Sequence, residues 1–254
     1  MTWNAKNSAV PVKDTAMRYV SFGHGKRSAV ILPGLSDGLT TVKGKALLLA
    51  PHYRSFFDEF TVTMFSRKDT MPEGYSIRDM ADDQAVAMQA LGLEGSFLMG
   101  VSEGGMIAGI LAAEHPELVK KLVLAVTAPC MNGLIRENVT CWIGYAEKGD
   151  HRSLMIDTAE RSYSPAYLKK YRRMYPVIGL VGKQKDYGRF LVNAKAILGF
   201  EGSEKLGNIS CPTLVIGGIP GSALYMYEGL GHAAYEEAKD YNARVFGFFR
   251  TGGE

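Results

Sequence analysis

The sequence has few cysteines and no long apolar run. Its three cysteines, Cys130, Cys141 and Cys211, form no CxxC pair and no zinc-ligand spacing, and an odd number excludes a fully paired disulfide framework. We therefore expect buried, reduced thiols in a cytoplasmic protein, and no metal site. The longest aliphatic stretch, residues 46–50, is far shorter than the ~20 residues of a membrane helix. Residues 1–14 contain no apolar stretch, so we expect no signal peptide.

The chain also lacks a large excess of positive or negative charge. Lysine and arginine together number 29 against 26 acidic residues, which gives a net charge of +3. This charge is too small to indicate a nucleic-acid or membrane partner. With 46% hydrophobic residues, 29 glycines and 10 prolines in 254 residues, the chain is neither disordered nor collagen-like. Its length suits one large domain with one sizeable core.

Strand-like and helix-like segments alternate along the chain. Strands are predicted at residues 17–22, 28–33, 60–65, 96–101, 119–126, 211–218 and 223–229, and helices at 76–92, 103–116 and 233–249. The Gly-His-Gly-Lys turn between the first two strands predicts an antiparallel hairpin, and Ser76 with Asp79 predicts a helix cap. The alternation predicts an α/β fold whose mostly parallel, twisted sheet carries helices on both faces.

Residues 130–205 break this alternation, because they contain helix-like segments but no predicted strand. We interpret them as an inserted helical cap on a core formed by residues 1–129 and 206–254. Residues 130–200 contain twelve basic and six acidic residues, an excess to which we give little weight as a sign of an acidic substrate. The segment is rich in aromatic residues, so we expect a cap with an aromatic underside. These residues are Trp142, Tyr145, Tyr163, Tyr167, Tyr171, Tyr175 and Phe190.

A serine lies between a predicted strand and a predicted helix, in the sequence Gly100-Val101-Ser102-Glu103-Gly104. The G-x-S-x-G pattern occurs by chance in many chains, but at a strand-to-helix turn it predicts a bend that raises the hydroxyl above the sheet. Gly100 and Gly104 leave room for the neighbouring backbone. The free N–H groups and the dipole of a helix start favour developing negative charge there. A glycine-rich helix start capped by serine is the plainer alternative.

Two further segments complete this pattern. The loop Pro33-Gly34-Leu35-Ser36-Asp37-Gly38 follows a predicted strand, where its Leu35 N–H can pair with the Glu103 N–H to form an oxyanion hole. Taken alone, the loop is an ordinary turn. His232 lies in a glycine-flanked loop before the last helix, where a general base could reach the hydroxyl. The other histidines occupy positions that suit plainer roles: His24, His52, His115 and His151.

With these motifs the sequence resembles the serine hydrolases of the α/β-hydrolase fold, of the esterase and lactonase type with a helical cap. The resemblance extends over nearly the whole chain, and VILPGLSDG, FLMGVSEGGMIAGILAAEHPELVKKLVLA, CPTLVIGG and YEGLGHAAYEE carry it. It implies that Ser102 is the nucleophile, that His232 is the base, and that Leu35 and Glu103 donate backbone N–H groups. It implies no metal and no organic cofactor.

The third member of the expected triad is missing from its usual place. In this family an Asp or Glu follows the strand at 211–218, but here only Ile219-Pro220-Gly221-Ser222 precede the next strand. Four residues are too few for a parallel crossover, which needs a dozen or more. The sequence therefore either omits a segment of about 15–20 residues between Gly218 and Ile219, which is the hypothesis we favour, or the last strand joins by another geometry. We expect none of Asp37, Glu103 and Glu228 to replace the acid.

These inferences predict a cytoplasmic, carboxylesterase-like enzyme that cleaves a small carboxylic ester or lactone through an acyl-enzyme on Ser102. Its partner would be a small ester-like molecule, with no nucleic acid and no membrane. Because the triad acid is missing, a non-catalytic ligand-binding or signalling protein on the same fold is the main alternative. Thioester, C–C or amide hydrolysis and a cofactor-free haloperoxidase or lyase also remain open, and the sequence predicts no oligomeric state.

Overall fold

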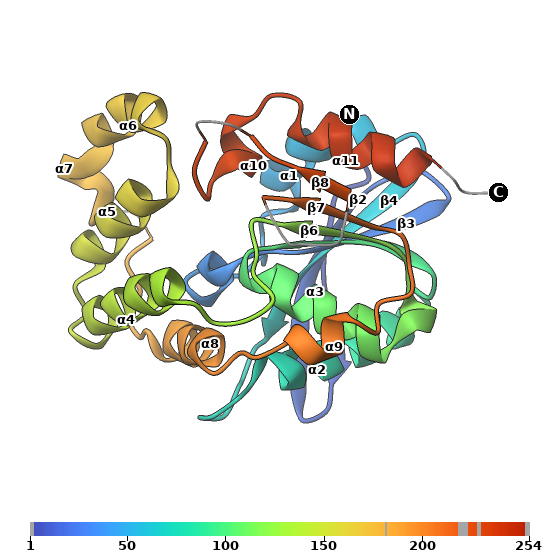
Figure 1. Cartoon of the computed structure of the whole chain (residues 1–254), viewed down its shortest axis with the longest axis horizontal. Helices are drawn as coiled ribbons and strands as arrows, with labels where there is room; N and C mark the ends of the chain where they lie inside the picture. The colour runs from blue at the N-terminus through green and yellow to red at the C-terminus, as the bar shows by residue number, and fades with distance from the viewer. Residues whose placement is uncertain (1–2, 181, 218–222, 228–229, 252–254) are drawn as a thin grey trace.

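The computed structural model describes residues 3–180, 182–217, 223–227 and 230–251 (Figure 1). In this part of the chain one sheet of eight strands forms, in the order β1-β2-β4-β3-β5-β6-β7-β8. The strands from β4 to β8 along this order are parallel, whereas β1 and β2 are antiparallel to their neighbours. The bounds are β1 Lys6–Val12, β2 Thr15–Gly23, β3 Arg27–Leu32, β4 Phe60–Lys68, β5 Ser96–Val101, β6 Val119–Ala125, β7 Thr213–Ile216 and β8 Ala223–Tyr225. The predicted mostly parallel sheet is confirmed.

Helices cover both faces of the sheet (Figure 1). One face carries α2 (Ile77–Ala90), α3 (Glu103–Glu114) and α9 (Ser203–Leu206), and the other carries α1 (Ala46–Leu49) and α11 (Tyr241–Arg250). The capping box predicted for α2 is present, with the Ser76 hydroxyl accepting from the Asp79 N–H and the Asp79 carboxylate accepting from the Ser76 N–H. The predicted last helix is divided into α10 (Ala234–Glu237) and α11 by an extended residue, Ala238.

The predicted hairpin between residues 17–22 and 28–33 is wrong. β2 and β3 lie on opposite sides of β4, and the hairpin is formed instead by β1 and β2, a strand pair that the sequence analysis missed. The turn after β2 passes so close to the start of β4 that a Cβ on Gly25 would lie 1.9 Å from the Glu59 carbonyl carbon. That close approach lets β4 enter between β2 and β3.

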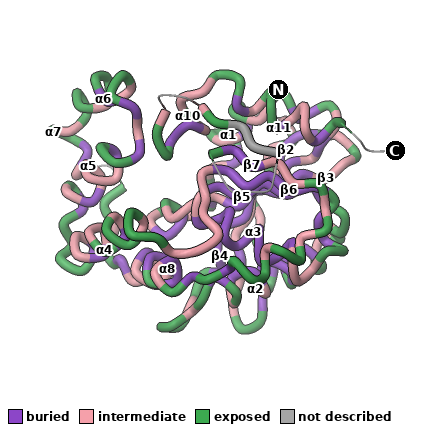
Figure 2. The backbone as a smooth tube through the Cα atoms, viewed as in Figure 1, coloured by how far each residue is buried: buried purple, intermediate pink, exposed green. Residues whose placement is uncertain are grey.

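Alternation along each central strand divides the buried side chains into two cores, one on each face. Buried residues are concentrated along the central strands (Figure 2). In β5, Leu98 packs on the side of α2 and α3, whereas Phe97 and Met99 pack against the α11 side. Every residue of β5 is buried, as expected for a central parallel strand. This strand leads directly into Ser102, so the predicted nucleophile follows a fully buried central strand.

Between β6 and β7 the chain forms the helical segment of residues 130–205, whose helices lie beside the carboxyl ends of the strands (Figure 1). Helix α8 packs on the 3-10 helix η1 (Leu35–Gly38), which holds the predicted oxyanion loop. The helices are α4 (Gly133–Glu147), α5 (His151–Ser162), α6 (Pro165–Tyr171), η4 (Arg172–Met174), α7 (Tyr175–Ile178) and α8 (Gly188–Leu198). The remaining 3-10 helices are η2 (Ala50–Phe56) and η3 (Pro116–Leu118).

Strand β8 pairs in parallel with β7, from Leu214 beside Ala223 to Ile216 beside Tyr225. This is the pairing that we expected the short connection to prevent. Because β8 is only three residues long, the chain has to return by only about 10 Å to start it, at ~3.3 Å per residue. Residues 218–222 lie outside the described residues, so the omitted segment between Gly218 and Ile219 stays a prediction.

Candidate active site

Ser102 occupies a strained turn between β5 and α3. Its backbone angles, φ 55° and ψ −119°, lie in a region that non-glycine residues rarely adopt. The glycines on either side are required by close backbone approach. A Cβ on Gly104 would lie 2.1 Å from the Leu32 carbonyl oxygen, and one on Gly100 would lie 2.3 Å from the Gly104 carbonyl oxygen. The local sequence therefore forces the serine hydroxyl out at the start of α3.

The structure brings His232 to this hydroxyl, although 130 residues separate the two in sequence. His232 Nε2 lies 2.9 Å from Ser102 Oγ, a hydrogen-bond distance. The imidazole borders an open cavity, but the protein around it desolvates the ring and lowers its pKa from the ordinary value of 6.5. A carboxylate beside the ring would raise the pKa instead, and none of the described residues has that effect.

The direction of this pKa shift predicts the pH dependence of any reaction that uses His232 as a base. A general base must be neutral, and a lowered pKa keeps the imidazole neutral to lower pH. We expect kcat/KM for p-nitrophenyl acetate to fall with decreasing pH through a midpoint below about 6.5. Initial rates between about pH 4 and 8 measure it. A midpoint above the ordinary value would show that a carboxylate acts on the ring.

Leu35 and Glu103 each provide the first N–H of a helix, of η1 and of α3 respectively. A first helical N–H has no acceptor within its own helix, so both groups are available to an incoming oxygen. Both residues border the same cavity as Ser102. The loop before Leu35 passes close to the serine, because a Cβ on Gly34 would lie 3.1 Å from the Ser102 Cβ. This arrangement is suited to stabilising an oxyanion formed at Ser102.

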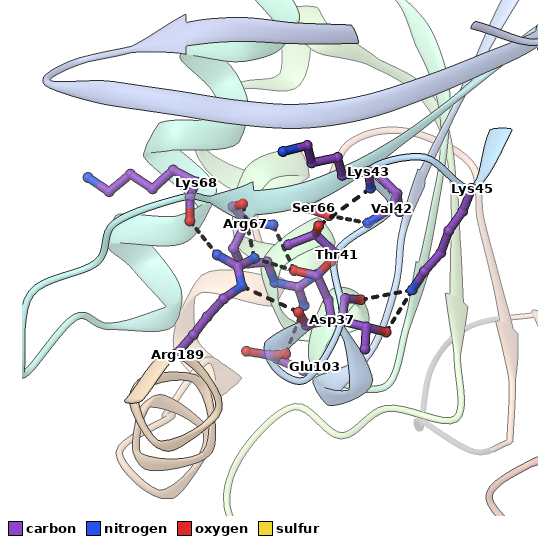
Figure 3. Close-up of polar contacts among 11 residues, drawn as sticks. Asp37, Thr41, Val42, Lys43, Lys45, Ser66, Arg67, Lys68, Glu103 and Arg189 are labelled. Carbon is purple, nitrogen blue, oxygen red and sulfur yellow. Dashed lines mark hydrogen bonds and ion pairs between the residues drawn. The ribbon is translucent and has the colours of Figure 1, made fainter. Parts of the chain in front are cut away.

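The Glu103 side chain forms a buried ion pair. It is fully buried, and its Oε2 accepts a hydrogen bond of 2.9 Å from the Arg67 guanidinium (Figure 3). Burial raises the pKa of the Glu103 carboxyl, and the nearby Arg67 charge opposes this shift. The ion pair joins the end of β4 to the first turn of α3, next to the proposed oxyanion donor.

Asp37 is the second buried carboxylate of this network. Its Oδ2 accepts from the Arg67 backbone N–H at 2.9 Å and from the Arg189 guanidinium at 2.6 Å (Figure 3). Arg189 reaches it from α8 and also donates to the Arg67 and Lys68 carbonyl oxygens. The helical segment is thus fixed to the loop that carries the Leu35 N–H by a charged contact that is largely withdrawn from water.

These contacts show the partners of two of the three residues considered as substitutes for the triad acid. Asp37 and Glu103 bind arginines rather than His232, as expected. The third candidate, Glu228, lies outside the described residues. Within the described ranges, Glu236 and Glu237 are the carboxylates nearest to His232 in sequence, and they accept hydrogen bonds from Tyr163 and Ser164. The described residues therefore contain Ser102 and His232 without a carboxylate bound to the imidazole.

A cavity of about 470 Å³ opens above Ser102. Its wall is mainly aliphatic and comes from both the sheet and the helical segment. The lining includes Met106, Leu134, Ile135, Val139, Trp142, Ile197 and Leu230. Of the seven aromatic residues predicted for the underside, Trp142 alone is part of this wall. Tyr163, Tyr167 and Tyr171 pack on one another, with neighbouring ring centroids 4.6–6.0 Å apart. The expected aromatic underside is therefore a mainly aliphatic wall, to which the helical segment contributes one of the seven predicted aromatic residues, Trp142.

Other expected features can be compared with the described residues. Cys130, Cys141 and Cys211 are free, but each is partly exposed rather than buried. No group of three or more His, Cys, Asp or Glu side chains in the described ranges is arranged to hold a metal ion. Each helix in these ranges is too short or too polar to cross a lipid bilayer.

Comparison with known proteins places this geometry in a known fold. Residues 61–145 match the family model of the alpha/beta hydrolase fold. Over 108 residues the chain is 33% identical to the RutD protein of Serratia proteamaculans (strain 568), whose name marks it as a proposed carbamate hydrolase. The alignment covers 40% of this chain and 39% of that protein, so the chain spans about two-fifths of the length of this curated relative.

Two solved structures align along almost the whole chain. MGS-M2, an alpha/beta hydrolase enzyme from a Medee basin deep-sea metagenome library, has a TM-score of 0.84 at 18% identity, covering 97% of this chain and 98% of that one. The enol-lactonase of Burkholderia xenovorans LB400 has a TM-score of 0.80 at 19% identity, covering 95% and 99%. The chain has the α/β-hydrolase fold. In α/β-hydrolases with a G-x-S-x-G motif, the serine at the strand-to-helix turn is the nucleophile. Ser102 stands at the corresponding turn after β5.

Sequence reasoning missed the arginines of this α/β-hydrolase-fold site. Arg67 lies beyond the predicted end of the strand at residues 60–65, and Arg189 lies 122 residues further along, in the helical segment. A possible signal was the charged run at the end of β4, where a buried strand continues through Arg67 and Lys68. Buried charges need partners, but a sequence alone does not say which ones.

Proposed function

We propose that this chain is a serine hydrolase in which Ser102 is the nucleophile and His232 the general base. The observation that carries this proposal is the 2.9 Å distance between His232 Nε2 and Ser102 Oγ at a strained strand-to-helix turn. A neutral imidazole at this distance can accept the hydroxyl proton as the oxygen attacks a carbonyl carbon. The imidazolium then returns the proton to the leaving group, and water releases the acyl group by the reverse sequence.

The N–H groups of Leu35 and Glu103 would bind the negative oxygen of the tetrahedral intermediate. Each such donor lowers the barrier by about 2.7–4 kcal/mol in related acyl-transfer sites. The buried pair of Glu103 with Arg67 supports this role, because it fixes the first turn of α3 from behind. No metal or organic cofactor is needed for these steps.

The substrate we propose is a small carboxylic ester or lactone with an apolar part, in the manner of a carboxylesterase. The cavity volume of about 470 Å³ and its aliphatic wall suit such a molecule. The likeness to an enol-lactonase and to a proposed carbamate hydrolase supports the same class, since each acts on a carbonyl bonded to oxygen or nitrogen. We further propose that residues 130–205 act as the cap over a core of 1–129 and 206–254, in a cytoplasmic protein.

A fluorophosphonate probe tests the catalytic assignment directly. Stoichiometric labelling is expected in the native protein, on the peptide that contains Ser102, and it should be absent in the Ser102→Ala variant. A panel of p-nitrophenyl esters of increasing acyl length, together with lactones, then identifies the substrate class against the same variant as blank. Labelling that persists in Ser102→Ala, or fails in the native protein, would contradict the proposal.

The second candidate is a ligand-binding protein on the same fold. It is favoured by one observation: His232 has no carboxylate partner among the described residues. For this candidate, an ester or lactone would raise the melting temperature without being consumed, and the fluorophosphonate would not react. The labelling experiment therefore separates the two candidates.

A further inference from the structure

The loop that carries His232 lies directly against the helical segment, where α5 is joined to α6. The Ala233 N–H donates a hydrogen bond of 2.9 Å to the Ser162 carbonyl oxygen. Gly231, the residue before His232, approaches the same oxygen so closely that a Cβ there would lie only 2.5 Å from it. The residues immediately before and after the imidazole are therefore both fitted to Ser162.

Helix α10 extends this contact along the next two residues of the helical segment. Both carboxylate oxygens of Glu237 are used on Ser164, because Oε1 accepts from the Ser164 N–H at 2.9 Å and Oε2 accepts from its hydroxyl. Glu236 accepts from the Tyr163 hydroxyl. Three consecutive residues, 162–164, are thus bonded to the seven-residue loop and helix from 231 to 237. We call these contacts the clasp.

The clasp can hold the imidazole in place where no carboxylate among the described residues does so. In a Ser-His-acid triad, the carboxylate holds the imidazole in its orientation. Within the part of the chain that the structure describes, the ring bonds to Ser102 and to no carboxylate. The backbone that carries the ring is instead held on both sides of His232 by Ser162 and, further along, by Ser164.

We infer that Glu237 is a positioning residue for His232, and that residues 162–164 of the helical segment hold the general base over Ser102. This inference rests on the proposed function only for its catalytic consequence. Ser162 also borders the cavity, so the segment that a substrate contacts is the one that holds the base. Charge-assisted hydrogen bonds such as those of Glu237 are about twice as strong as neutral ones. We therefore expect the Glu237 carboxylate to contribute most to the stability of the clasp.

Three variants test the inference in the full-length chain. Glu237→Ala removes the acceptor, Glu237→Gln keeps one acceptor oxygen of the same size, and Ser164→Ala removes the hydroxyl from the opposite side. Glu204→Ala, at an exposed glutamate on α9, is the matched control. Hydrogen–deuterium exchange of residues 230–237 and 162–164 is measured for each variant, together with kcat and KM on the best ester of the panel.

We expect Glu237→Ala and Ser164→Ala to accelerate exchange in both segments. We expect Glu237→Ala to lower kcat about 10- to 100-fold with KM within about threefold, since a misplaced base affects the transition state more than substrate binding. Glu237→Gln, which keeps one acceptor oxygen but loses the charge, should recover part of the loss, and the control should match the native chain. Unchanged exchange in Glu237→Ala, or a loss that appears only in KM, would overturn the inference. If the native chain is inactive, the proposed function fails, and the exchange data still decide whether the clasp holds the loop.

Discussion

Replacing His232 with alanine should lower kcat for an activated ester by only about 10²-fold. In a complete serine triad, loss of the serine or the histidine costs about 10⁶-fold, and loss of the acid alone about 10⁴-fold. A site that already works without the acid therefore has only the remaining ~10²-fold to lose. Because His232 has no carboxylate partner in the described residues, we expect the smaller figure.

The measurement is kcat for p-nitrophenyl acetate in His232→Ala, with Ser102→Ala as the matched variant. Both should fall to the same residual rate, because the two groups act as one unit. Circular dichroism confirms that each variant is folded. A loss near 10⁶-fold would mean that an acid supports the imidazole. Glu228, or a carboxylate in a segment omitted between Gly218 and Ile219, would then be the candidate.

Replacing Arg67 with methionine should destabilise the fold by about 3–5 kcal/mol, because it leaves Glu103 fully buried without its cation. Urea unfolding of the native and variant chains measures this difference. Burial already raises the pKa of Glu103, so the folded variant should hold its proton more tightly than the unfolded chain does. The stability loss should consequently shrink as the pH falls and grow as it rises.

The double variant Arg67→Met/Glu103→Gln is the control for this mechanism. Removing both charges of a buried pair is often close to neutral, so the second substitution should restore most of the lost free energy of unfolding. A single-variant loss below about 1 kcal/mol, typical of a solvent-exposed pair, would contradict the buried network. Failure of the double variant to recover would mean that Arg67 stabilises the fold through other contacts.

The sequence predicted the parallel sheet and pointed to Ser102 and His232, which the structure places within hydrogen-bond distance, because both predictions depend on local signals. A sharp turn from a strand into a helix needs glycines where the backbone passes closely, as at Gly100 and Gly104. His232 is the single histidine in a glycine-flanked loop before the last helix. Strand order was harder to predict. The turn at residues 23–26 has the composition of a hairpin, yet β4 enters between its two strands, and only tertiary packing decides that.

Local sequence patterns also did not predict which partners some side chains contact. Glu103 follows Ser102 in the sequence, but no local pattern predicts that its side chain pairs with a buried arginine from β4. Tyr163, Tyr167 and Tyr171 of the helical segment were expected beneath it, but they pack on one another. Trp142 remains in the cavity wall. In both cases the outcome depends on partners far away in sequence, whose identity no spacing rule contains.

The ion pair between Arg189 and Asp37 has a consequence for how this architecture can be rearranged. Exchanging residues 130–205 for the corresponding part of another hydrolase would remove Arg189 and leave Asp37, which is 2% exposed, facing an unmatched surface. The insertion is therefore not an independent module. A chimera that preserves this ion pair must transplant the loop of residues 33–38 together with the helices that pack on it.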